Sequence, residues 1–103
     1  MINGPDYLNI LRKLVKNPNI NQRKLATDLG LSLGKLNYCL KALREKGLIK
    51  IKNFKKNKNK SRYLYILTPS GISHKTKLTL NFMKQRLKEY DELHSEIKSA
   101  EDQ

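Results

Sequence analysis

Residues 21–47 read NQRKLATDLGLSLGKLNYCLKALREKG, and this stretch decides the fold. It predicts two helices, of which the first is capped by Asn21 and ended by Gly30, and the second is capped by Ser32 and ended by Gly47. Leucines recur at helical spacing in both, so each helix has one apolar face. Two short helices meeting at such a turn form a helix-turn-helix, whose second helix commonly lies in the major groove of DNA.

The first turns of both helices carry only basic charges. Acidic residues are favoured there because the helix dipole is positive at its N-terminus, yet these turns hold Arg23, Lys24 and Lys35. A phosphate at each helix N-terminus would explain this choice, since backbone N–H groups and basic side chains would bind it together. The alternative is that these residues are solvated surface cations.

The chain is strongly basic, and its charge is unevenly distributed. Its 103 residues include 22 Lys and Arg against 9 Asp and Glu, which gives a formal net charge of +13. Residues 1–68 hold 16 basic and 3 acidic residues, whereas residues 69–103 hold six of each. This division indicates that the first region binds a polyanion and that the second has another role.

A further helix is predicted over residues 5–16, where apolar residues recur on one face for three turns. Pro5 suits its first position, and Asn17 with Pro18 stops it. Packed across the helix-turn-helix, this helix would complete a three-helix base.

Two strands are expected after Gly47. Ile49 and Ile51 alternate with lysines, and residues 62–68, RYLYILT, are rich in aromatic and β-branched types. Residues 53–61 between them are polar and like-charged, so we expect a loop there. A hairpin with a cationic tip beside a helix-turn-helix is a wing, which reaches sugar-phosphate or the minor groove. A lysine-rich loop is often only solvated, but its position after the second helix favours a nucleic-acid contact.

The last segment is predicted to be one long helix. Thr68 suits its cap and Pro69 its first position, and roughly thirty residues of helix would reach about 45 Å. Its apolar positions follow the alternating spacing of a heptad seam, widened by Phe82 and Leu93. The seam consists of Leu80, Met83, Leu87, Tyr90, His94 and Ile97. We expect it to pair with a second chain, the alternative being a helix folded back on its own domain.

Other classes of function lack the residues they require. No apolar run approaches the roughly 18 residues of a membrane span, and no N-terminal signal pattern occurs. A single cysteine gives no disulfide framework, so a cytoplasmic protein is expected. The sequence places no cysteine or carboxylate at metal-ligand spacing from His74 or His94, and neither a phosphate-binding glycine loop nor a nucleophile motif occurs. We predict no enzymatic activity, no metal and no cofactor, and the sequence assigns no small-molecule effector.

The order of these elements, with LATDLGLSLGKLNYCLKALREKGLIK followed later by LTPSG, resembles the MarR-type winged-helix transcriptional regulators. Within that family the chain is most similar to the short members associated with exopolysaccharide (EPS) clusters. The resemblance covers about residues 5–97. It implies a homodimer that binds a pseudo-palindromic operator through recognition helix 33–46 and a lysine-rich wing at 53–61.

Candidate DNA-contacting residues follow from the basic first turns and the lysine-rich loop described above, from the resemblance, and from turning the leucines of the recognition helix inward and advancing about 100° per residue. On the two helices they are Arg23, Lys24, Ser32, Gly34, Lys35, Asn37, Tyr38 and Lys41. In the wing they are Lys55, Lys56, Lys58, Lys60 and Arg62. Asn pairs with adenine edges and Lys with guanine edges, while the bare Gly34 lets the backbone approach the duplex.

The predicted fold class is mostly α with a small β-hairpin. A winged helix-turn-helix domain occupies residues 1–71, and a dimerisation helix occupies residues 72–103. The predicted function is sequence-specific binding of double-stranded DNA by a homodimeric transcriptional regulator, of exopolysaccharide or related genes. One alternative is a winged helix that serves as a protein-interaction or assembly module, and another is binding of RNA or DNA by shape alone. Cys39 is expected in the core, although some MarR-type relatives are oxidation sensors.

Overall fold

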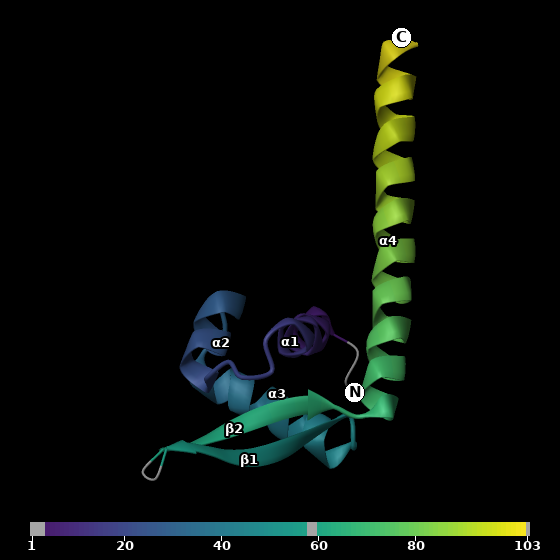
Figure 1. Cartoon of the computed structure of the whole chain (residues 1–103). Coiled ribbons are helices and arrows are strands. Elements are labelled where there is room, and N and C mark those ends of the chain that lie inside the picture. The colour runs from purple at the N-terminus through teal and green to yellow at the C-terminus, as the bar shows by residue number, and fades with distance from the viewer. Residues whose placement is uncertain (1–3, 58–59, 103) are drawn as a thin grey trace.

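The described part of the chain forms four helices and a two-stranded hairpin, whose arrangement Figure 1 shows. The computed structural model describes the backbone of residues 4–57 and 60–102 and the side chains of residues 4–52 and 64–102. The elements in order are α1 (Pro5–Lys16), α2 (Gln22–Leu29), α3 (Leu33–Glu45), β1 (Ile49–Asn57), β2 (Lys60–Leu67) and α4 (Pro69–Glu101). The predicted fold class is confirmed.

Both ends of α2 and the start of α3 are those that the sequence predicts. The side chains of Asn21 and Ser32 accept hydrogen bonds from the backbone N–H groups of Lys24 and Lys35, at 2.8 and 3.1 Å. Gly30 ends α2 in the left-handed conformation, with φ 67°, which residues with a Cβ rarely adopt. These local signals fix where α2 stops and where α3 begins.

A single hydrophobic core draws on every element. Leu11 of α1, Leu25 of α2, Leu36 of α3, Ile49 of β1 and Leu78 of α4 are all buried in it. α1 contacts α2, α3, α4 and β2, so it is the central element of the domain. Because Leu78 belongs to this core, the first turns of α4 pack as part of the domain, and the division at residue 71 stays a prediction.

The hairpin is longer than the sequence predicts. β1 continues to Asn57 and β2 begins at Lys60, and the antiparallel ladder runs from Ile49 opposite Leu67 to those two residues. The loop expected over 53–61 is therefore wrong in its extent. The ladder continues because its hydrogen bonds join backbone groups and need no apolar side chain.

The base of the hairpin is attached to the helix-turn-helix through Tyr65 of β2, which is buried. The Gln22 side-chain amide donates a hydrogen bond to the Tyr65 hydroxyl at 2.5 Å. The backbone N–H of Tyr65 donates to the Pro18 carbonyl oxygen at 3.4 Å. These bonds set the direction in which the hairpin leaves the domain.

The start of α4 is bonded to the segment that follows α3. The Thr68 hydroxyl donates to the Gly47 carbonyl oxygen at 2.5 Å and accepts from the Gly71 N–H at 3.0 Å, while the Thr68 N–H donates to the Leu48 carbonyl oxygen at 3.0 Å. Gly71 approaches the same strand entry so closely that an added Cβ would collide with the Leu48 carbonyl oxygen. Only glycine fits at this contact.

α4 leaves the domain as a straight rod, which Figure 1 shows rising from its base. At about 1.5 Å per residue its 33 residues span about 50 Å, and the longest dimension of the molecule is 71 Å. Over its described length α4 does not fold back, so that alternative is wrong. Phe82 packs against the core instead of widening the seam, whereas Leu93 is exposed.

Gly71→Ala should lower the free energy of unfolding by about 1–3 kcal/mol, because the new methyl group collides with the backbone at Leu48. Gly34→Ala is the matched control, since a Cβ built there meets no described atom within 4 Å other than those of its chain neighbours and of its own helix backbone. Alanine is the better helix former, so the control should gain up to about 1 kcal/mol. Urea unfolding followed by circular dichroism, at one protein concentration, measures both. Equal stabilities would contradict the close contact at Gly71.

Candidate nucleic-acid interface

α3 has one buried face and one exposed face. Leu36, Cys39, Leu40 and Leu43 are buried against the other elements. The exposed residues at its start and on its other face include Ser32, Gly34, Lys35, Asn37, Tyr38 and Lys41. The structure therefore brings all six candidates of the recognition helix to one exposed surface, and their contact with DNA stays a prediction. The helix itself ends at Glu45, one residue before the predicted end.

The exposed face of α3 presents an aromatic ring and cations. Tyr38 is 66% exposed, and the Lys35 ammonium lies 5.7 Å from the centre of its ring, within the range of a cation–π contact. The Lys41 ammonium is 4.0 Å from a Glu45 carboxylate oxygen, and both side chains are exposed, so this pair contributes little to stability. At Gly34 the surface is bare backbone, which a partner can approach closely.

A hollow of about 630 Å³ lies between the start of α2 and the start of α3. Its lining consists of Asn21, Gln22, Arg23, Lys24, Thr27 and Leu33. The first turns of the two helices point partial positive charge outward, and Arg23 and Lys24 are exposed beside the hollow. The region therefore favours an anion, and the structure places these two predicted residues near α3.

Leu33 is a surface residue that the sequence analysis missed. Helical periodicity places it on the same side as Leu40, but it is 40% exposed and lines the hollow beside α2. Thr27 was missed as well, since it belongs to no apolar or basic pattern. Only its place beside the hollow identifies it.

The hairpin adds exposed cations at Lys50 and Lys52 of β1. They are not among the DNA-contacting residues predicted from the sequence, although the alternation of the strand places them opposite the buried Ile49. The side chains of Lys55, Lys56, Lys60 and Arg62, and Lys58 as a whole, lie outside the described residues. Their contact with phosphate stays a prediction.

The described residues also bear on metal binding and on membrane insertion. Among them, no three His, Cys, Asp or Glu side chains come together where they could hold a metal ion. In the same part of the chain, no helix is both long enough and apolar enough to cross a membrane.

Part of the chain matches a known protein family. Residues 8–50 match the model described as winged helix-turn-helix DNA-binding. The matched segment runs from α1 through the recognition-type helix α3 to the start of β1. No curated protein matches the chain in sequence.

Solved structures extend the likeness to the rest of the fold. The chain is similar to the PcaV transcriptional regulator from Streptomyces coelicolor in complex with its natural ligand, with 22% identity and a TM-score of 0.68 over 81% of this chain. It is similar to a variant of Staphylococcus aureus MepR bound to an oligodeoxyribonucleotide, with 21% identity and a TM-score of 0.64, over 92% of this chain and 75% of that one. It is also similar to Lactococcus lactis ZitR, a zinc-responsive MarR family member, with 25% identity and a TM-score of 0.64 over 86% of this chain.

These comparisons confirm the winged-helix fold with a long C-terminal helix. The chain spans 57% of that PcaV chain and 59% of that ZitR chain. The expected resemblance to MarR-type regulators is confirmed at the level of fold. The narrower similarity to exopolysaccharide-associated members stays a prediction.

Cys39 lies on the inner flank of α3 and is fully buried, as the sequence predicts. It lies beside Tyr7 of α1, where burial and then the neighbouring Cys39 thiol raise the pKa of the Tyr7 hydroxyl. A thiol that senses oxidants needs solvent access, which this position lacks. The structure therefore supports a packing role for Cys39.

The thiol of Cys39 should not react with an aromatic disulfide reagent while the protein is folded, and should react fully in denaturant. The reagent's absorbance at neutral pH measures both states, and the Cys39→Ser chain gives the background. Fast, complete reaction of the folded protein would show an accessible thiol and would favour the sensor alternative.

Proposed function

We propose that this protein is a transcriptional regulator, without enzymatic activity, that binds a specific site in double-stranded DNA as a homodimer. The exposed face of α3 would read the bases, and the hairpin would hold the phosphate backbone. The observation that carries the proposal is the division of α3 into a buried leucine face and an exposed polar face, beside basic residues of α2 and β1. A MepR variant of the same fold is bound to an oligodeoxyribonucleotide, which supports a nucleic-acid partner.

Each exposed residue of α3 has a contact suited to its chemistry. Asn37 offers both an acceptor and donors, which suit an adenine edge, and Lys41 can donate to the acceptors of guanine. Tyr38 can pack on a sugar or on a thymine methyl group. Gly34 leaves the backbone free to approach the duplex, and Lys35 lies close enough to bond a phosphate at the helix N-terminus.

The remaining cations would add affinity without choosing a sequence. Arg23 and Lys24 stand beside the hollow at the start of α2, and Lys50 and Lys52 are exposed on β1. We assign to the same role the basic residues of the wing, which are Lys55, Lys56, Lys58, Lys60 and Arg62. Contacts of this kind position a protein on the duplex, because every sequence has the same backbone.

The homodimer is supported by the apolar seam of α4. Its five large apolar residues, Leu80, Met83, Leu87, Tyr90 and Ile97, are each 50–65% exposed, and His94 is exposed beside Tyr90 with ring centres 6.0 Å apart. A row of exposed apolar side chains of this length marks an interaction surface. A second copy of the chain, paired through residues 72–103, is the partner that we propose.

Two-fold symmetry of the dimer would be matched by a pseudo-palindromic operator. The proposed target genes are those for exopolysaccharide or related products. The support for them is the resemblance of residues 25–50 to the exopolysaccharide-associated regulators. The proposed place of action is the cytoplasm. No effector is assigned.

Substitutions on α3 should weaken binding to the cognate duplex selectively. The cognate duplex is one selected from genomic fragments by the unchanged protein. Three variants, Asn37→Ala, Tyr38→Ala and Lys41→Ala, should each lose about 1–3 kcal/mol of binding free energy on this duplex, because each removes a base contact. Their binding to unrelated duplexes should change little. Asn81→Ala, at an exposed position of α4, is the matched control and should bind as the unchanged protein does. Fluorescence anisotropy with both duplexes measures the difference. Equal affinity for all duplexes before any substitution would favour recognition by shape alone.

Substitutions in the wing should act on all duplexes alike. The variant has Gln in place of Lys55, Lys56, Lys58 and Lys60, and it should bind cognate and unrelated duplexes more weakly by the same factor. The slope of log affinity against log salt concentration should become less steep by about one for each phosphate that is no longer neutralised. Lys16→Gln on α1 is the control for removal of charge alone. If the wing variant changed sequence preference while the α3 variants did not, the two roles would be reversed.

A further inference from the structure

The two halves of α4 carry opposite charges. Residues 69–88 contain five basic residues and no acidic one, whereas residues 89–102 contain six acidic residues and one basic. The basic residues of the first half are Lys75, Lys77, Lys84, Arg86 and Lys88. The acidic residues of the second half are Glu89, Asp91, Glu92, Glu96 and Glu101, together with Asp102, the C-cap that follows α4. The near-zero total charge of this region therefore conceals a strong charge separation along one rod.

The exposed apolar seam runs through both halves. Leu80, Met83 and Leu87 belong to the basic half, and Tyr90 and Ile97 belong to the acidic half. A partner that covers the whole seam must therefore meet positive charge at one end and negative charge at the other. A second copy of α4 carries both kinds of charge. Which half it presents to each end of the seam depends on whether the two helices run parallel or antiparallel.

We infer that two copies of the chain pair through this seam with their α4 helices antiparallel. The basic half of each helix then faces the acidic half of the other, whereas a parallel pair would place like charges side by side along its whole length. The inference rests on the homodimer of the proposed function and adds its direction. Arg86 also lies 3.5 Å from Glu89 on its own helix, but both side chains are exposed, so this pair leaves most of the charge separation in place.

The spacing of the seam supports an antiparallel register. When the two helices cross between residues 88 and 89, each large residue of one half meets a seam residue of the other half. The aligned pairs, each formed twice, are Leu80 with the partner's Ile97, Met83 with the partner's His94, and Leu87 with the partner's Tyr90. On the flank of the same register, Lys84 lies beside the partner's Asp91.

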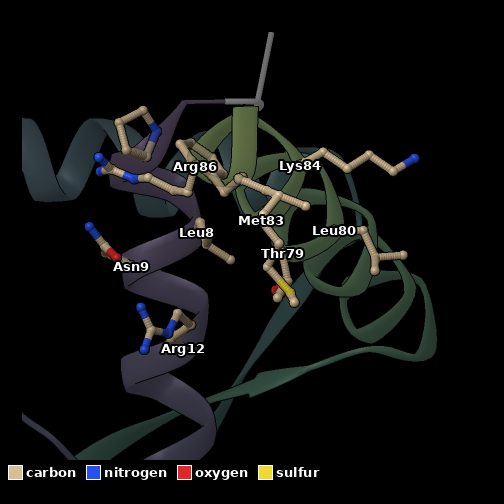
Figure 2. Close-up of a pocket in the computed structure, with 11 residues that line it drawn as sticks. Leu8, Asn9, Arg12, Thr79, Leu80, Met83, Lys84 and Arg86 are labelled. Atoms are coloured by element: carbon tan, nitrogen blue, oxygen red, sulfur yellow. The ribbon is translucent and has the colours of Figure 1, made fainter. Parts of the chain in front are cut away.

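A groove between α1 and the basic half of α4 offers room for the partner helix. Its volume is about 890 Å³, and Figure 2 shows Leu8 and Arg12 on one side of it and Met83 and Lys84 on the other. Apolar side chains line it together with three cations, the third being Arg86. In the antiparallel register the partner's acidic half passes this groove, where its carboxylates meet the cations of both α1 and α4.

The antiparallel pair also sets the distance between the two domains. About 20 residues of helix separate Thr68 from the crossing point, which at about 1.5 Å per residue is about 30 Å. The domains would leave the paired rod at points about 60 Å apart. The length of α4 would then fix the separation of the two recognition surfaces.

Neutralising the acidic half of α4 changes the strength of self-association in opposite directions for an antiparallel and a parallel pair. The variant Asp91→Asn with Glu92→Gln and Glu96→Gln should self-associate about three- to tenfold more weakly at low salt, because it loses attraction to the partner's basic half. A parallel pair would instead associate more tightly, since repulsion between acidic halves would be relieved. Sedimentation equilibrium of the full-length chains measures the change, with Glu45→Gln as control and circular dichroism to verify helix content. Unchanged or tighter association would overturn the inference.

Disulfide trapping gives a second, independent measurement. A mixture of Leu80→Cys and Ile97→Cys chains of different tag size should form a disulfide between unlike chains, and Ile97→Cys alone should not, because its two copies would lie about 25 Å apart. The unchanged chain, whose Cys39 is buried, is the control. Trapping of Ile97→Cys with itself would overturn the antiparallel direction and leave the homodimer standing. A full-length chain that stays monomeric at tens of micromolar would overturn both, while duplex binding by that monomer would still support the role of α3.

Discussion

Burial of the leucine face of α3 is the interaction on which the rest of the structure depends. Leu36, Leu40 and Leu43 are covered by the other elements, and their removal from water sets the rotation of α3 about its own axis. Once that rotation is set, the 3.6-residue period brings Gly34, Asn37, Tyr38 and Lys41 to the opposite, exposed face. The positions of the candidate reading residues thus follow from packing.

A second constraint joins this surface to the rod. Thr68 and Gly71 bond and pack against Gly47 and Leu48, so the first turn of α4 is held by the residues that follow α3. Leu78 then continues the contact into the core. A partner bound along α4 would therefore be held in a fixed position relative to α3, because the first turn of α4 is bonded directly to the residues that follow α3.

The helices could be predicted from the sequence because their signals are local. Caps at Asn21, Ser32 and Thr68, the left-handed Gly30, and leucines at helical spacing act within one or two turns, and the structure confirms each of them. The features that were missed depend on tertiary context. The hairpin is extended by a backbone ladder that side-chain patterns do not report. Phe82 and Leu33 have apolar side chains at helical spacing, and only their neighbours in space decide that the first packs on the core and the second is exposed.

Part of the candidate site, like part of the fold, could be predicted from the sequence. Periodicity identifies the exposed face of α3, whereas the hollow beside Arg23 arises where two helix starts meet in space and has no pattern of its own. The distribution of charge along α4 was present in the sequence, but it acquires meaning only when the helix is found to be exposed along its seam. The net charge of the region does not reveal this separation, since the positive charges of the first half and the negative charges of the second half sum to zero.

Hydrogen–deuterium exchange of the full-length protein, with and without a selected cognate duplex, tests the central claim most directly. The account predicts that the duplex slows exchange of backbone amides at the start of α3 and along the hairpin, and leaves α1 nearly unchanged. Slower exchange confined to α1 or α4, with α3 and the hairpin unaffected, would contradict the claim that the exposed face of α3 binds DNA.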